Sequence, residues 1–195
     1  MITIELERPD DAAGIEDLLD RAFGVERHGK TAQRLRDGQR PARGLAFVAR
    51  ERGRPIGTLR FWSVRIGRLH RALLLGPIAV DPDCRNRGIG ARLITTGLAR
   101  AKSLGHRAVI LVGDAPYYER FGFSSVLTAG MVLPGPVDRA RFLAIEFVTG
   151  ALAGAGGLVV PDVAETASPA RSRVAPFATD VPMRLRAPVG RAAAA

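Results

Sequence analysis

An apolar strand that runs through a glycine-containing turn straight into a long helix constrains this fold more than any other feature. Residues 72–80 are apolar on both faces, which is typical of a central strand. Residues 89–104 carry apolar side chains at helical spacing and stop before Gly105. The turn between them therefore places the partnerless N–H groups of a first helical turn at the end of a buried strand.

The rest of the chain alternates between strand and helix patterns. Apolar residues at helical spacing indicate a first helix between a cap at Asp10 or Asp11 and a stop at Gly24. Helical character at 30–36 is weaker, and a short helix is expected around 116–121. Strand patterns occupy residues 2–6, 45–49, 55–62, 109–112, 129–133 and 142–148. At 195 residues, the chain fits one domain with little excess.

The composition changes after Gly150. Residues 151–157 are small, and residues 161–195 are rich in alanine, proline, arginine, serine and threonine. We therefore predict a domain over 1–150 and a C-terminal extension over 151–195. In that extension we expect one strand at 158–160 and then an extended or poorly ordered tail.

Charge and residue usage exclude several classes of protein. The formal net charge of +10, from 29 basic and 19 acidic residues, favours anionic ligands such as phosphates. Nucleic-acid binding is not favoured, because the arginines are dispersed and only two tyrosines and one tryptophan are available for stacking. One cysteine and three scattered histidines indicate neither a disulfide framework nor a metal site. Without a secretory signal or membrane span, we expect a cytoplasmic, metal-free protein.

The turn after the central strand has the features of a phosphate cradle. Gly88 and Gly90 lack the Cβ atoms that would keep a pyrophosphate from the backbone, and Arg85, Arg87 and Arg92 can add charge-assisted hydrogen bonds. The spacing excludes a Walker loop, because no lysine follows the second glycine. It also excludes the dinucleotide fingerprint, because a leucine stands where its third glycine would be. The remaining pattern is R-x-x-G-x-G.

This pattern resembles the acyl-CoA-binding segment, [RQ]-x-x-G-x-[GA], of the GNAT superfamily of N-acetyltransferases. Residues 76–82, Gly-Pro-Ile-Ala-Val-Asp-Pro, resemble the strand end that precedes that segment in the family. Residues 117–123, Tyr-Tyr-Glu-Arg-Phe-Gly-Phe, resemble the family's F-Y-E-K-L-G-F segment. The residues of these motifs are most similar to those of the YhbS-like branch of the family, and the resemblance covers residues 1–150.

The resemblance implies an α/β, GNAT-like fold with a mixed, mostly antiparallel sheet of six or seven strands and helices on both faces. It also implies an acyltransferase that uses acetyl-CoA as acyl donor. A bulge, for which Gly76-Pro77 is suited, separates the central strand from 109–112 so that the cofactor lies between them. The pantetheine arm is then bound by the backbone of Ile78, Ala79 and Val80. The pyrophosphate is held by the backbone amides of Arg85, Asn86, Arg87, Gly88, Ile89, Gly90 and Ala91.

Tyr118 matches the family tyrosine that lies near the cofactor sulfur and protonates the departing thiolate. The phenol suits this role, since its ordinary pKa of about 10 exceeds the value of about 8.5 for a thiol. A backbone N–H near Ile78 is expected to polarise the thioester carbonyl. Many members of the family have asparagine where this chain has Asp114. The cofactor contact of that asparagine is therefore not carried over to Asp114.

The implied reaction is direct attack of a primary amine, on a small molecule or a protein, at the thioester. The general base is left open among Glu26, Glu51, His70, Asp114 and Glu146. A second hypothesis keeps the fold as a non-catalytic acyl-CoA-binding sensor or regulatory module, and a third is a basic nucleic-acid-binding protein. The family and the C-terminal extension are compatible with a homodimer.

Overall fold

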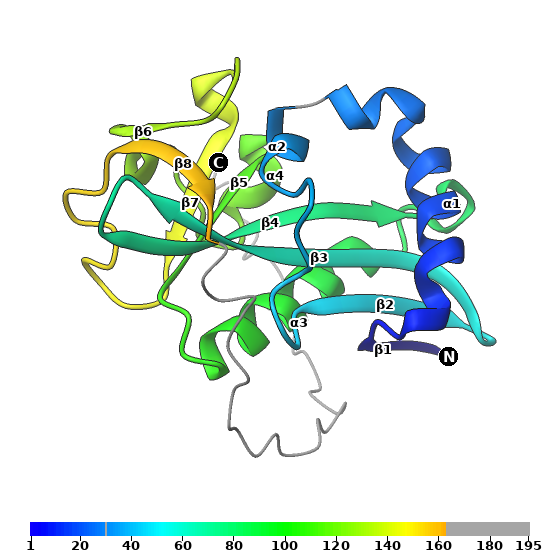
Figure 1. Cartoon of the computed structure of the whole chain (residues 1–195). Helices are drawn as coiled ribbons and strands as arrows, with labels where there is room; N and C mark the ends of the chain where they lie inside the picture. Colours follow the sequence, from blue (N-terminus) through cyan, green and yellow to red (C-terminus); the bar gives the residue numbers. More distant parts are fainter. Residues whose placement is uncertain (30, 163–195) are drawn as a thin grey trace, which may run out of the picture.

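The computed structural model describes residues 1–29 and 31–162 (Figure 1). Its helices are α1 (Ala12–Phe23), α2 (Thr31–Arg34), α3 (Ile89–Ser103) and α4 (Ala115–Glu119), with short 3-10 turns η1 (Pro9–Asp11), η2 (Val25–Gly29), η3 (Pro82–Cys84), η4 (Val126–Thr128) and η5 (Arg139–Arg141). Its strands are β1 (Ile2–Leu6), β2 (Ala46–Glu51), β3 (Arg54–Ile66), β4 (His70–Val80), β5 (Ala108–Val112), β6 (Met131–Val132), β7 (Phe142–Glu146) and β8 (Gly157–Pro161).

The strands form a mixed, mostly antiparallel sheet in the order β1-β2-β3-β4-β5-β7, which confirms the predicted architecture. Along this path only β4 and β5 run parallel. The sheet has eight strands in the described part of the chain, more than the expected six or seven. The additional pairing arises because β3 extends past the end of β2, and β8 pairs antiparallel with the free edge at Val64, Arg65 and Ile66. The two-residue strand β6 pairs parallel with β8.

Helices cover both faces of the sheet, as predicted (Figure 1). On one face, Ile89, Leu93 and Ile94 of α3 are buried in the core cluster formed with β2, β3 and β4. Gly97 brings α3 close to β3, because a Cβ atom there would lie 2.6 Å from a ring carbon of Phe61. On the other face, α1 buries an apolar stripe against two strands, through Ile15, Leu18, Leu19, Val48 and Ala79.

The C-terminal part of the described chain contributes β8, where the sequence predicts a strand over 158–160. The domain boundary at residue 150 stays a prediction. The tail expected after that strand lies, from residue 163 on, outside the described residues. No helix within residues 1–29 and 31–162 is long and apolar enough to cross a membrane.

Candidate active site

The central strands β4 and β5 separate soon after they meet. Their parallel pairing is confined to Leu73 with Val109 and Leu74 with Ile110. Directly afterwards the register between β3 and β4 shifts, since Leu59 faces Ile78 but Phe61 faces Leu75, so that β4 holds one extra residue. The shift falls at Gly76-Pro77, a cis peptide whose glycine has φ 128°, and confirms the predicted bulge. Beyond it, β4 stays with β3 while β5 pairs with β7.

Past the bulge, the gap between the separated strands β4 and β5 forms an opening, and the backbone of β4 presents alternate residues to it. The Asp81 N–H donates to the carbonyl of Ile56 on β3 (2.9 Å). Because successive residues of a strand direct their polar groups to opposite edges, Ala79 also faces β3, whereas Ile78 and Val80 face the side that β5 has left. The Ala79 side chain is buried against α1. Of the three predicted pantetheine residues, the structure therefore turns two toward the opening.

The turn after β4 forms a cradle of free amides at the start of α3. Gly88 is the N-cap in the left-handed conformation (φ 72°), and Asn86 is also left-handed (φ 62°). The first bond into the helix runs from Arg92 N–H to the Gly88 carbonyl (3.0 Å), so the N–H groups of Ile89, Gly90 and Ala91 have no acceptor within α3. These donors and the positive end of the helix dipole suit a pyrophosphate.

Three elements approach closely at Gly90 of this cradle. A Cβ atom there would lie 3.1 Å from Tyr117 Oη of α4, 3.7 Å from Val80 Cγ2 and 4.0 Å from Ile78 Cδ1. The first turn of α3, the open part of β4 and the hydroxyl of Tyr117 thus meet at one point. The position of the Tyr117 hydroxyl at the cradle is a finding of the structure.

The three arginines near the cradle have different surroundings. Arg87 makes a bidentate ion pair with Glu51 of β2, with distances of 2.6 and 2.9 Å from its terminal nitrogens to the two carboxylate oxygens. This hydrogen-bonded pair lowers the pKa of Glu51. Arg92 donates to the carbonyl of Ile2 (3.3 Å). Arg85 has no ion-pair partner among the residues that the structure describes.

Asp81 supports the cradle from behind, a role that sequence reasoning missed. It is 1% exposed, and its Oδ1 accepts the N–H of Asp83 (3.1 Å), which begins the turn. Its Oδ2 lies 3.3 Å from Arg21 of α1 and also pairs with Arg54 at the start of β3. The Val-Asp-Pro sequence before the turn was the available signal, but its two arginine partners are distant in the chain.

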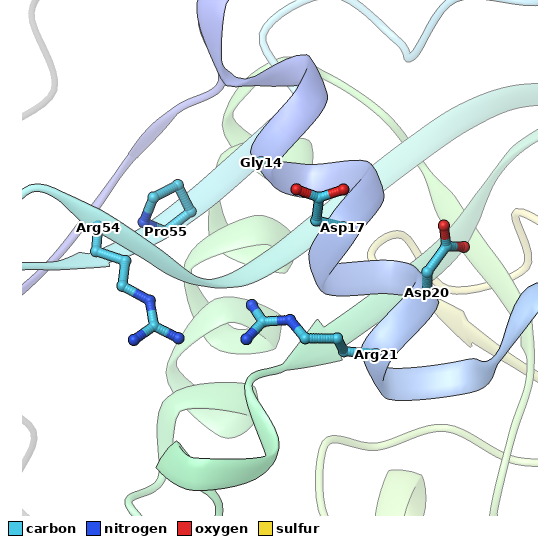
Figure 2. Close-up of a pocket in the computed structure, with 6 residues that line it drawn as sticks. All are labelled: Gly14, Asp17, Asp20, Arg21, Arg54 and Pro55. Carbon is cyan, nitrogen blue, oxygen red and sulfur yellow. The ribbon is translucent and has the colours of Figure 1, made fainter.

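A surface pocket of about 450 Å³ lies beside this ion-pair cluster, under α1. Figure 2 shows the guanidinium groups of Arg21 and Arg54 reaching toward one another across it. Its other lining residues are Gly14, Asp17, Asp20 and Pro55. The pocket is on the α1 face of the sheet, so it is separate from the cradle at α3.

Tyr118 is 8% exposed and packs in the core cluster of the α3 face. Its ring contacts Tyr117 and Phe123 edge-on, with centroid distances of 5.1 and 5.9 Å. Gly113 makes room for it, since a Cβ there would lie 2.2 Å from the ring. Burial, reinforced by Tyr117 and Asp114 and opposed by Arg141, raises the pKa of Tyr118 to about 12. The hydroxyl is therefore neutral at physiological pH.

Several of the candidate bases are already engaged. Glu51 binds Arg87. Glu146 accepts the backbone N–H groups of Gly150 and Leu152, at 3.0 and 2.6 Å. His70 Nε2 lies 3.1 Å from the carbonyl of Ala153. Two of the five candidates, Glu26 and Asp114, have no such partner in the described residues.

Trp62 forms part of the wall at the bulge. Its indole N–H donates to the carbonyl of Gly76, and the side chain is 7% exposed. The bond fixes an aromatic ring from β3 beside the point where β4 and β5 separate. In the described parts of the chain, no group of three histidine, cysteine, aspartate or glutamate side chains could hold a metal ion.

Known proteins are similar to this chain in sequence and in architecture. The model of the acetyltransferase (GNAT) family matches residues 12–123. The N-acetyltransferase YhbS of Escherichia coli strain K12, itself described as uncharacterized, is 32% identical over 157 residues, or 80% of this chain and 93% of YhbS. A crystal structure of Escherichia coli YhbS in complex with CoA aligns with a TM-score of 0.71 and 31% identity, over 82% of this chain and 89% of that one.

A second solved structure is a GNAT family acetyltransferase from Brucella melitensis in complex with acetyl-CoA. It aligns with a TM-score of 0.60 and 32% identity, over 76% of this chain and 89% of that one. These findings confirm the family predicted from the three sequence motifs. The chain belongs to the GNAT family of N-acetyltransferases.

Proposed function

We propose that this protein transfers the acetyl group of acetyl-CoA to a primary amine of a small molecule or protein by direct attack. The observation that carries the proposal is the opening between β4 and β5, which ends at the free amides of Ile89, Gly90 and Ala91. The CoA and acetyl-CoA complexes of the two related structures support the choice of donor. When bound, acetyl-CoA supplies an activated thioester.

The residues of the opening fit a pantetheine arm and a pyrophosphate. The backbone groups of Ile78 and Val80 bind the arm as an added strand would, and Ala79 holds β4 against α1. The predicted pyrophosphate-binding amides follow the strand, and run through Arg85, Asn86, Arg87, Gly88, Ile89, Gly90 and Ala91. In our proposal Arg85 adds its side chain, whereas Arg87 contributes backbone because its guanidinium binds Glu51.

Three groups of the chain carry the acyl transfer in our proposal. The N–H of Ile78 donates to the thioester oxygen and stabilises the negative charge that develops there. Tyr118 stays protonated, because its pKa is about 12, and donates its proton to the departing sulfur. The C–N bond forms as the C–S bond breaks, and the neutral amine loses one proton. That proton balances the one that Tyr118 gives to the sulfur, so the products are an amide and a free thiol.

Calorimetric titration of acetyl-CoA at physiological salt, with ATP as a control for generic anion binding, tests the donor. We expect saturable binding of acetyl-CoA and no binding of ATP. Equal binding of both would mean that net charge attracts phosphates, and binding of neither would overturn the proposal. Thiol release with a panel of amines then tests turnover, and binding without turnover on any amine would favour the sensor hypothesis. The homodimer and the cytoplasmic location stay predictions.

A further inference from the structure

A network of ion pairs lies on the sheet face that α1 covers. Arg60 of β3 donates from two nitrogens to the two carboxylate oxygens of Glu7, both at 2.8 Å, and a third nitrogen lies 3.3 Å from Glu16. Arg27 of η2 pairs with Glu16 at 2.5 Å and with Asp20 at 2.7 Å. Both arginines of this network are thus matched by carboxylates.

Arg36, in the turn after α2, lies close to these two arginines but has no carboxylate of its own. Its Nε donates to the carbonyl of Ala32 (3.1 Å), and its two terminal nitrogens have no acceptor among residues 1–29 and 31–162. The neighbouring Asp37 carboxylate binds Gln33 instead (2.7 Å). Burial, with the positive charges of Arg27 and Arg60, lowers the pKa of Arg36 to about 10, although Asp37 opposes the shift.

Arg36 lies near Arg60 of β3, the residue that the register shift leaves opposite the bulge of β4. The preceding residue, Leu35, packs in one core cluster with Trp62 and Leu74. The Trp62 indole donates to the Gly76 carbonyl at the bulge, and Leu74 is the last residue of β4 that pairs with β5. Leu35 belongs to the cluster on the sheet face opposite α3 and α4, so we place the acceptor amine on this face, at the end of the opening where β4 and β5 meet.

The terminal nitrogens of this half-buried guanidinium have lost part of their hydration, and no carboxylate replaces it. An anionic ligand group would restore that interaction, and the planar fork of arginine matches a carboxylate in a bidentate geometry. We propose that Arg36 binds a carboxylate of the acceptor, so that the substrates are amines that also carry a carboxylate, amino acids among them. The inference rests on the proposed acetyl transfer and names the substrate class of the same site.

Matched pairs of acceptors test this directly, with each amino acid compared with the amine obtained by removing its carboxylate. Lysine with cadaverine, phenylalanine with phenethylamine and leucine with 3-methylbutylamine form a suitable panel. For the wild type we expect kcat/KM to be at least about tenfold higher for the amino acid in the preferred pair, the scale of one charge-assisted hydrogen bond. Arg36→Gln should raise the KM of the amino acid about 10- to 100-fold and leave its amine unaffected.

Three controls separate acceptor recognition from a structural effect. Arg40→Gln removes an exposed arginine just after the turn that contains Arg36 and should change neither member of the pair. Arg36→Lys should restore part of the preference, because it keeps the charge but not the bidentate geometry. The KM of acetyl-CoA and the thermal midpoint of Arg36→Gln should match the wild type, which would show that the fold and the donor site are intact.

Different outcomes would overturn the role of Arg36 and the proposed acetyl transfer. A wild type that binds acetyl-CoA but acetylates only the amines, or neither series, overturns the role of Arg36 and leaves the donor site standing. An Arg36→Gln variant that slows both members of a pair equally also overturns it. A wild type that fails to bind acetyl-CoA overturns the proposed function itself.

Discussion

In the proposed reaction Tyr118 combines two roles, packing in the core and donating a proton, that a sequence motif cannot separate. Its ring fills space against Gly113 and Phe123, which makes it a core aromatic. Its hydroxyl has no hydrogen-bond partner among the described residues, and burial keeps it protonated with a pKa of about 12. The packing holds the ring in one place, so a hydroxyl on it is positioned at little further entropic cost. The two roles can be tested apart, because phenylalanine keeps the ring.

We expect Tyr118→Phe to lower kcat about 100-fold, the lower end of what a general acid contributes, with the KM of acetyl-CoA within about twofold of the wild type. Steady-state thiol release measures both constants. Tyr117→Phe is the matched control, since it removes a neighbouring hydroxyl that lies at Gly90 and should change kcat little. An unchanged kcat in Tyr118→Phe would remove the acid role.

The raised pKa of Tyr118 also predicts a pH dependence. An ordinary phenol ionises near pH 10, but a group with a pKa of about 12 stays protonated to higher pH. The rate should therefore rise as the amine loses its proton and show no decline from Tyr118 up to about pH 10. In the unfolded chain this phenol has its ordinary pKa of about 10, lower than in the folded chain. Its contribution to the free energy of unfolding is therefore complete below about pH 10 and is lost as the pH rises toward 12.

Ultraviolet titration of phenolate absorbance measures this difference directly. The wild type should contain one phenol that titrates well above pH 10 and is missing from Tyr118→Phe. A wild type and variant with the same high-pH titration would contradict the assignment.

At the scale of elements, the turn between β4 and α3 is held by contacts on both sides of the sheet. Glu51 of β2 pairs with Arg87, which is well exposed, and Gly90 meets α4 on one side. On the α1 side, Asp81 ties the turn to Arg21 and Arg54. If this turn binds a pyrophosphate as we propose, such restraints favour binding, because less order has to be acquired.

Asp81→Asn should weaken this restraint. The variant removes a buried charge and leaves two arginines beside each other, but both are about half exposed, so we expect a loss of about 1–2 kcal/mol of unfolding free energy. The KM of acetyl-CoA should rise several-fold with kcat little changed, because the turn binds and does not react. Asp83→Asn, at an exposed neighbour, is the control, and an equal rise in KM there would contradict the role of Asp81.

The contact of α3 with α4 makes a prediction at Gly90. Gly90→Ala adds a Cβ atom 3.1 Å from Tyr117 Oη, so that hydroxyl must move and the cradle narrows. We expect the KM of acetyl-CoA to rise about tenfold. Combining it with Tyr117→Phe removes the contacting oxygen and should restore part of the affinity, which a double-mutant cycle of calorimetric titrations measures. Strictly additive effects would show that the contact is not responsible.

At the scale of the whole molecule, local pattern predicted the elements better than their partners. Helix α3 and strand β5 lie where their apolar spacing placed them, because each buries a continuous apolar surface whatever its neighbours are. The pairing of β8 with β3 was not predicted, since it depends on how far β3 extends past β2. The strand predicted over 129–133 is only two residues long in the structure, as β6. Its only ladder partner among the described strands is β8, and that pairing also could not be read from local pattern.

The sequence by itself determined the family, through three motifs in order, and the positions of the bulge and the turn. Glycine permits the unusual backbone conformations there and proline fixes its own φ, so both act within a few residues. The tertiary structure decided which groups face the cradle. Arg87 is engaged by Glu51, 36 residues away, and Asp81 by Arg54, 27 residues away. Ala79 faces β3 because of strand alternation counted from the bulge. Charge pairing and edge orientation arise only when distant segments meet, so no local pattern contains them.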